Sequence, residues 1–168
     1  MRGPRFTKLF LEDKELNKDK KHFFVGLDEE KKKELLRNTE NLKKKDVFGY
    51  NPPYIKDVEF PEKEVKRIAD KINKSKADYI WICVGSPKQN ILAGNLYKKI
   101  KHNSFYIFNV GAALDFKIKT KKEAPRFVQE AGLEWIYRLI TDFKYSKKKV
   151  WRSMLGRWYA LGMVDLDK

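Results

Sequence analysis

The stretch Tyr79-Ile-Trp-Ile-Cys-Val-Gly-Ser-Pro-Lys-Gln-Asn90 decides the fold of this chain. Its first half is an unbroken apolar run without a polar face, which predicts a strand buried on both sides, as in a parallel sheet. Gly85 ends the run, Ser86 is a candidate helix N-cap, and Pro87 suits the first helical position. A strand, turn and helix in this order put a helix N-terminus at the carboxyl edge of a sheet, where an anion can bind. An ordinary turn with a good cap explains the same residues.

The same alternation of strand and helix continues along the chain. The predicted strands cover residues 22–27, 47–50, 79–84 and 104–111. The predicted helices cover a short segment around 6–11, then 28–42 with Asp28 as N-cap, 61–74, 87–101 and a segment opened by Pro125, with a charged loop over 12–21. Repeated βα units predict an α/β fold, a Rossmann-like parallel sheet flanked by helices. The pattern leaves the order of the strands open.

A second candidate ligand loop follows the predicted strand 104–111. Gly111-Ala-Ala-Leu-Asp115 has small residues that let a ligand approach the backbone, followed by one carboxylate. Because parallel strands end at the same edge of a sheet, we expect the loops after Gly85 and Gly111 to border each other. Asp115 then either takes part in ligand binding or only caps a helix.

The composition indicates an anionic partner. The 168 residues include 38 Lys and Arg against 23 Asp and Glu, a formal charge of +15, which suits nucleic acid, an anionic membrane surface or a phosphorylated substrate. Cys83 is the single cysteine, so an intramolecular disulfide is excluded and a reducing compartment is favoured. The sequence has neither a membrane-spanning apolar run nor the apolar core of a signal peptide, and we expect a cytoplasmic protein. We expect no metal and no cofactor.

The end of the chain combines basic residues with an apolar face. Between Lys144 and Tyr159 there is no acidic residue, and the basic residues are Lys144, Lys147, Lys148, Lys149, Arg152 and Arg157. The apolar residues at helical spacing are Val150, Trp151, Met154, Leu155, Trp158 and Tyr159. Such a helix suits an anionic membrane surface, although a terminal helix packed on the core has the same pattern. We therefore divide the chain into an α/β domain, 1–143, and a basic amphipathic appendage, 144–168.

Short motifs occur in a fixed order along the chain. They are Asn51-Pro-Pro53, Val84-Gly-Ser-Pro-Lys-Gln89, Asn109-Val-Gly-Ala-Ala-Leu-Asp-Phe116, Ala124-Pro-Arg126 and Gly132-Leu-Glu-Trp-Ile-Tyr-Arg-Leu139. Together they resemble the WecG/TagA/CpsF family of bacterial glycosyltransferases over nearly the whole chain. The resemblance implies transfer of an N-acetylhexosamine or hexose from a UDP-sugar to a polyprenyl-diphosphate-linked acceptor in cell-surface polysaccharide synthesis.

The resemblance also implies a mechanism and a location. The reaction is expected to invert the anomeric centre without a metal held by an Asp-x-Asp motif. The protein is expected to be peripheral at the inner face of the cell membrane, and a homo-oligomer is compatible with this location. No recognised nucleic-acid motif is present, which disfavours DNA or RNA as a partner.

The motifs give roles to individual residues. Asp115 is the candidate catalytic base or a donor-binding carboxylate, and Gln89 can both donate to and accept from a sugar hydroxyl or a uracil edge. Arg138 suits a phosphate, although an ion pair with Glu134 on the same helix explains it equally well. The expected substrate-binding residues are Gly85, Ser86, Lys88, Gln89, Gly111, Arg126, Arg138, Arg152 and Arg157.

The chain also departs from the family pattern. Asn90 replaces a Glu, Leu114 replaces a Phe, and Glu123 replaces an Arg before Ala-Pro. The sequence begins inside the family pattern, so the segment with the family's proposed catalytic Asp has no counterpart before Arg2. We therefore expect either a weakly active transferase or a catalytically silent module that binds a nucleotide-sugar or the membrane. A nucleic-acid binder is a third hypothesis, supported by charge alone.

Overall fold

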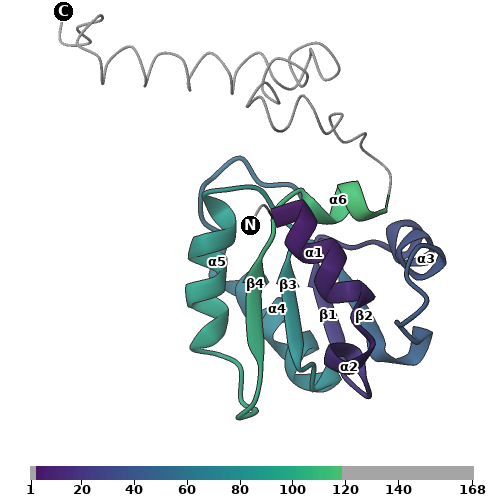
Figure 1. Ribbon diagram of the computed structural model, residues 1–168. Helices are drawn as coiled ribbons and strands as arrows, with labels where there is room; N and C mark the ends of the chain where they lie inside the picture. Colours follow the sequence, from purple (N-terminus) through teal and green to yellow (C-terminus); the bar gives the residue numbers. More distant parts are fainter. Residues whose placement is uncertain (1–2, 119–168) are drawn as a thin grey trace, which may run out of the picture. The chain divides into compact units, whose positions relative to one another are not determined.

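Strands and helices alternate along residues 3–118, the part of the chain that the computed structural model describes (Figure 1). The strands are β1 (His22–Val25), β2 (Val47–Tyr50), β3 (Tyr79–Ile82) and β4 (Tyr106–Asn109). The helices are α1 (Gly3–Glu12), α2 (Lys14–Asn17), α3 (Glu29–Arg37), the 3-10 helix η1 (Lys44–Asp46), α4 (Glu62–Ser75), α5 (Lys88–Tyr97) and α6 (Ala113–Lys117). The predicted helix after Pro125, the appendage 144–168 and the domain boundary after residue 143 lie outside the described residues.

All four strands are parallel in one sheet, in the order β2-β1-β3-β4. β3 pairs with β1 on one side and with β4 on the other, so that Ile82 lies opposite Val25 and Asn109. Parallel neighbours need a crossover, which α3, α4 and α5 supply between successive strands. The predicted Rossmann-like sheet flanked by helices is therefore confirmed.

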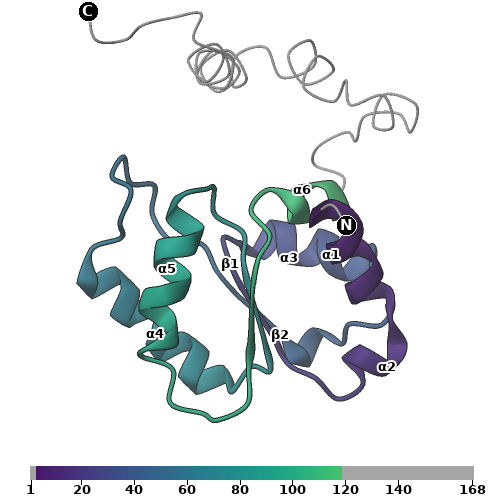
Figure 2. The same cartoon turned by 60° about the vertical axis from the view of Figure 1, so that its left-hand side comes forward.

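Successive side chains of β3 enter different hydrophobic cores. Ile80 and Ile82 pack with α4 and α5 on one face of the sheet, whereas Tyr79 and Trp81 pack with α1, α3 and α6 on the other (Figure 2). Ile80, Trp81 and Ile82 have no exposed surface. The predicted burial of this strand on both faces is confirmed, and each such side chain stabilises the fold by about 1.5–3 kcal/mol.

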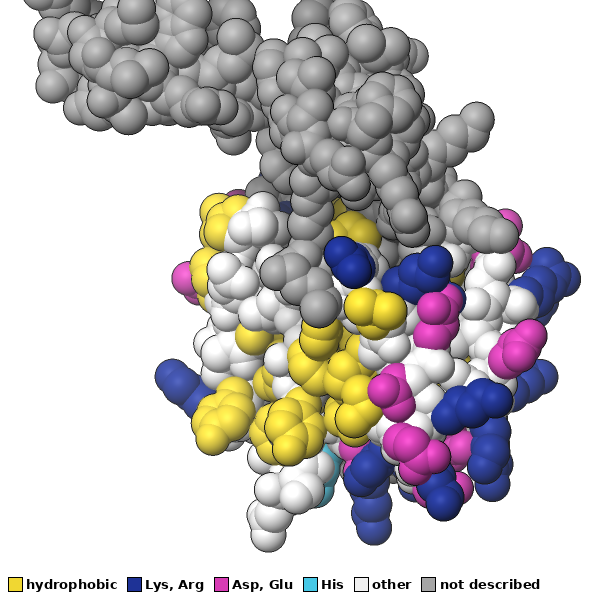
Figure 3. Space-filling view, viewed as in Figure 1, with side chains coloured by type: hydrophobic (Ala, Val, Ile, Leu, Met, Phe, Trp, Pro, Cys, Tyr) yellow, Lys and Arg dark blue, Asp and Glu magenta, His cyan; other side chains and the backbone are white. Residues whose placement is uncertain are grey.

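β4 lies at one edge of the sheet and is the least buried of the four strands. Tyr106 is 66% exposed and stacks on Phe108, which in turn contacts Phe6 and Phe10 of α1. Figure 3 shows hydrophobic side chains gathered on this face, whereas charged side chains of both signs cover the side that carries α3. The edge of the sheet that β4 forms is therefore bordered by aromatic rings.

The helix after β3 begins later than the sequence predicts. Ser86 is the predicted N-cap, but α5 begins at Lys88, and Pro87 occupies the cap position without a side-chain hydrogen bond. The backbone closes this turn itself, because Gln89 N–H donates to Gly85 C=O (3.2 Å). The capping role of Ser86 is thus wrong, and the helix also ends at Tyr97, earlier than predicted.

The predicted charged loop 12–21 contains a helix, α2. Asp13 caps it by accepting a hydrogen bond from Leu16 N–H (3.0 Å). The sequence prediction missed this helix because it is only one turn long and has no apolar periodicity.

Helix α3 begins as predicted and ends early. Its N-cap is Asp28, whose carboxylate accepts from Lys31 N–H (2.8 Å). The helix stops at Arg37 rather than continuing to residue 42, and Asn38 is its C-cap, where the side-chain amide donates to Glu34 C=O (2.9 Å). Asn commonly competes with helical hydrogen bonding in this way.

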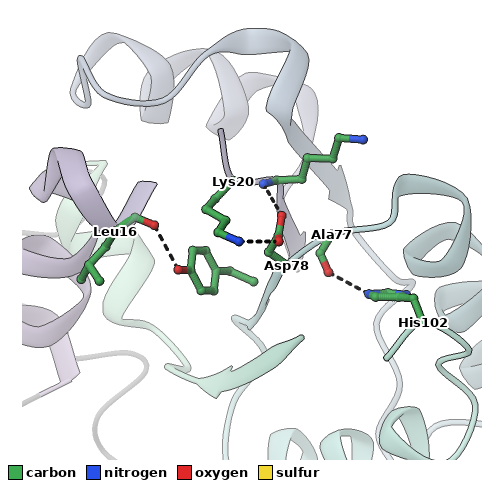
Figure 4. A network of polar contacts seen from close by, with 7 residues as sticks. Leu16, Lys20, Ala77, Asp78 and His102 are labelled. Carbon is green, nitrogen blue, oxygen red and sulfur yellow. Dashed lines mark hydrogen bonds and ion pairs between the residues drawn. The ribbon is translucent and has the colours of Figure 1, made fainter. Parts of the chain in front are cut away.

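Asp78 ties the segment before β1 to the start of β3 (Figure 4). Its carboxylate accepts from Lys21 N–H (2.9 Å) and from the Lys20 ammonium (3.0 Å). Partial burial alone would raise the pKa of Asp78, but these hydrogen bonds and the Lys20 charge hold it below its ordinary value. Tyr79 O–H also donates to Leu16 C=O (3.0 Å), which fixes α2 to the same edge of the sheet.

His22 is a fully buried histidine at the start of β1. Its ring stacks on Trp81, and Trp81 Nε1–H donates to His22 Nδ1 (3.1 Å). Nδ1 can accept this bond only when it carries no proton. Burial lowers the pKa of His22 to about 4, although the charge of Asp78 opposes the shift.

We predict that the protein loses stability as the pH falls from 6.5 to 4. Over this range His22 is protonated in the unfolded chain but stays neutral in the folded one, so the free energy of unfolding drops by about 3 kcal/mol at most. The loss stops below the folded pKa. Denaturant unfolding at a series of pH values measures it.

His22→Gln keeps an acceptor for Trp81 N–H but does not titrate, so it should remove most of this pH dependence. His102→Gln, which changes the other histidine of the chain, should retain it. An equal slope in the His22→Gln variant and the unmodified protein would contradict the prediction.

Candidate functional site

The loops that follow the four strands all leave the sheet at its carboxyl edge, uppermost in Figure 1. This follows from the parallel order and the register, in which Val25, Tyr50, Ile82 and Asn109 end their strands side by side. In open parallel sheets this edge is where ligands bind. The candidate site is therefore built from the loops after β1, β2, β3 and β4.

The Gln89 side chain lies against Gly111. Gly111 has a φ of +52°, and a Cβ at this position would lie 3.2 Å from Gln89 Oε1. The loops after β3 and β4 therefore border each other, as the sequence predicts. Glycine at position 111 is needed both for the backbone conformation and for this close approach.

The amide oxygen of Gln89 is buried and has no hydrogen-bond partner among the described residues. Leaving a buried acceptor without a donor costs free energy, about 1–3 kcal/mol. A ligand that brings an N–H or O–H group to this oxygen would recover that cost. Gln89 is thus a candidate for ligand recognition on structural as well as sequence grounds.

Asp115 forms an ion pair that the sequence analysis did not anticipate. Its Oδ1 lies 3.1 Å from Nζ of Lys31 in the first turn of α3, and the two side chains are 21% and 35% exposed. The pair connects α3, which follows β1, to α6, which follows β4. Lys31 is one of three consecutive lysines in the sequence. Only its position three residues after the N-cap Asp28 sets it apart from the other two, so the sequence alone does not show which lysine reaches Asp115.

Cys83 lies just beyond β3 and close to this ion pair. Burial raises the pKa of its thiol, the Asp115 charge raises it further, and the Lys31 charge lowers it. The side chain therefore stays a neutral thiol at physiological pH, and a nucleophilic role is disfavoured.

Lys88 connects the candidate site to the loop between β2 and α4. Its ammonium donates a hydrogen bond to Ile55 C=O and lies 5.4 Å from the centre of the Tyr54 ring. Lys88 is one of the substrate-binding residues expected from the sequence, which gives no role to Tyr54. The structure adds an anchoring role for Lys88 and brings Tyr54 to the site.

A hollow of about 270 Å³ lies elsewhere in the described part of the chain. Its lining includes Lys14, Lys18, Lys20, Asn41 and Lys43, which precede β1 and β2. It therefore opens at the amino edge of the sheet and shares no residue with the candidate site. Lysines and carboxylates alternate around it, and two of its charges, Lys43 and Asp19, already pair with each other (3.5 Å).

The remaining predicted site residues, Arg126, Arg138, Arg152 and Arg157, lie outside the described residues. Within residues 3–118 there is no group of three or more His, Cys, Asp or Glu side chains that could hold a metal ion. None of the helices described for this chain is long and apolar enough to cross a membrane.

We predict that Gly111→Ala lowers the free energy of unfolding by about 1–2 kcal/mol, because the left-handed conformation is strained for alanine. The added methyl group also displaces the Gln89 amide. The matched control is Gly94→Ala in α5, where nothing lies within 4 Å of the new Cβ and the free energy should rise by about 0.5–1 kcal/mol. Denaturant titration measures both. Equal stability of the two variants would contradict the assigned contact.

Comparison with known proteins supports the interpretation of the motifs. Residues 1–163 match the family model described as the glycosyl transferase WecG/TagA/CpsF family. A search of the solved structures finds no match to the chain. The match covers almost the whole sequence and confirms the resemblance drawn from the motifs.

Proposed function

Because the chain belongs to the glycosyl transferase WecG/TagA/CpsF family, we propose that it moves a sugar from a UDP-sugar to a polyprenyl-diphosphate-linked acceptor. The sugar is an N-acetylhexosamine or a hexose, and the reaction serves cell-surface polysaccharide synthesis. The observation that carries this proposal is the meeting of Gln89, Gly111 and the Asp115–Lys31 pair at one edge of the sheet.

The donor is held by complementary charge and by hydrogen bonds. The N-terminus of α5 and the ammonium groups of Lys88 and Lys31 favour a diphosphate at this edge. The open acceptor of Gln89 suits the N–H of a uracil or of an acetamido group, or a sugar hydroxyl. Gly85, where nothing lies within 4 Å of an added Cβ, lets the ligand approach the backbone closely, and Gly111 makes room for the Gln89 amide at the site.

The chemistry requires a base and a stabilised leaving group. A carboxylate, with Asp115 as the candidate, takes the proton of the acceptor hydroxyl. At the same time the oxygen of that hydroxyl attacks the anomeric carbon of the donor sugar. The bond from that carbon to the UDP oxygen breaks on the opposite face, so the configuration inverts and UDP leaves with the electron pair. Cationic side chains neutralise the departing diphosphate, and we assign this role to Lys88, Arg126, Arg138, Arg152 and Arg157.

A second candidate function is a module that binds the nucleotide-sugar without transferring the sugar. The ion pair at Asp115 favours it, because Oδ1 already contacts the Lys31 ammonium (3.1 Å), and this contact competes with an acceptor hydroxyl for the same oxygen. Binding of UDP without turnover would distinguish this module from the transferase.

The test is a transfer assay combined with a thermal shift by UDP. We expect UDP to raise the melting temperature of the full chain by mass action, and Gln89→Ala to reduce that shift more than Asn95→Ala, a control in the same helix. Asp115→Asn should slow transfer by about 10²–10⁴-fold while the UDP shift persists. An unchanged melting temperature at millimolar UDP would contradict the proposed nucleotide site. Transfer insensitive to Asp115→Asn would place the base elsewhere.

The acceptor lipid places the reaction at a membrane, and we propose that the segment 144–168 contacts anionic lipid there. Replacing Lys144, Lys147, Lys148 and Lys149 by Gln should weaken co-sedimentation with anionic vesicles, because each charge contributes about 1 kcal/mol. The control replaces Lys33, Lys44, Lys45 and Lys63, which are exposed on the described unit. Equal loss in both variants would show a general charge effect and contradict a dedicated segment.

A further inference from the structure

Tyr54 is an aromatic ring exposed at the carboxyl edge of the sheet. Its side chain is 88% exposed and stands on the loop between β2 and α4, which rises beside the start of α5 (Figures 1 and 2). The other tyrosines among the exposed large side chains lie elsewhere: Tyr97 ends α5 and Tyr106 begins β4. Within the described residues, Tyr54 is thus the one strongly exposed aromatic side chain that borders the candidate site.

Lys88 holds this loop in place. Because its ammonium donates to Ile55 C=O, the residue next to Tyr54 is fixed to the first residue of α5. The same ammonium lies 5.4 Å from the centre of the Tyr54 ring, a geometry in which a cation attracts the face of an aromatic ring. Pro52 is buried, which anchors the other side of the loop. The ring is therefore presented by an anchored loop and remains open to a ligand.

The neighbouring residues show which part of a ligand would reach the ring. Lys88 begins α5, and the next residue, Gln89, closes the Gly85 turn and carries the buried acceptor that lacks a donor. A nucleoside diphosphate whose phosphates lie at this turn has a flat, uncharged base at its other end. The face of an exposed aromatic ring offers such a base a stacking surface, whereas the electron-rich ring face does not attract a phosphate.

We propose that Tyr54 is the platform on which the nucleobase of the donor stacks, with Lys88 as the residue that positions the platform. The inference rests on the proposed function, in which this edge binds a UDP-sugar, and it adds the residue that recognises the base. Lys88 then serves both ends of the nucleotide, through its charge near the diphosphate and through its hold on the loop that carries Tyr54.

The experiment compares UDP with inorganic pyrophosphate, which carries the same linked phosphates without a nucleoside, by calorimetric titration of the full chain. Tyr54→Ala should weaken UDP binding by about 5- to 150-fold, the range found for loss of base–aromatic stacking. Pyrophosphate binding should change less than two-fold. Tyr54→Trp should restore UDP affinity, and UDP should quench the fluorescence of this variant more than that of the unmodified protein.

Tyr97→Ala is the matched control, since it removes another tyrosine, 69% exposed, at the far end of α5, and it should leave UDP affinity unchanged. Lys88→Met combined with Tyr54→Ala should cost less than the sum of the two single changes, because Lys88 acts on the base through Tyr54. Unchanged UDP affinity in Tyr54→Ala would overturn the platform and leave the proposed function standing. An equal loss for UDP and pyrophosphate would also overturn it. Failure of the unmodified protein to bind UDP would instead overturn the proposed function.

Discussion

The architecture depends on the burial of β3. This strand is hydrogen-bonded on both sides, by β1 and β4, and its side chains enter a hydrophobic core on each face of the sheet. A slip of β3 by one residue would move Trp81 out of the core that it shares with Phe24 and Leu35 and into the opposite core, which is packed around the smaller Ile80 and Ile82. The register of β3 therefore fixes where β1 and β4 end, and so fixes which loops share the carboxyl edge.

The two edges of the sheet have different tasks. At the amino edge, Tyr79 bonds to Leu16 of α2, Asp78 bonds to the segment before β1, and the His22 ring accepts a hydrogen bond from Trp81 of β3. At the carboxyl edge, the Gln89 oxygen has no donor among the described residues, and Tyr54 is almost fully exposed. The hydrogen bonds at the amino edge hold the strands and α2 together, whereas at the carboxyl edge the Gln89 oxygen is open to a ligand. Functional residues commonly lie on loops held by such a rigid scaffold.

Much of this arrangement could be predicted from the sequence, because it depends on local patterns. The unbroken apolar run 79–84 indicates a strand buried on both faces, and Asp28 indicates the start of α3. The loops after Gly85 and Gly111 could be placed together because parallel strands end at one edge. The family motifs identified the chain without any structure, as the match over residues 1–163 confirms.

Other features depend on contacts between distant residues, and the local pattern does not contain them. The strand order, the pairing of Lys31 with Asp115 and the anchoring of the Tyr54 loop by Lys88 each join segments far apart in the sequence. Ser86 is predicted wrongly for a different reason. Its residue type favours an N-cap, but the turn is closed by a backbone hydrogen bond from Gln89 N–H to Gly85 C=O. The sequence prediction therefore succeeds where propensity and tertiary packing agree.

The central claim is that the carboxyl edge of the sheet binds the donor nucleotide, and amide chemical shifts during titration of the labelled protein with UDP test it most directly. The account predicts that the largest changes occur at Gly85, Lys88, Gln89 and Gly111, which surround the proposed site. Changes confined to the amino-edge hollow around Lys14 to Lys20, or no changes at saturating UDP, would contradict it.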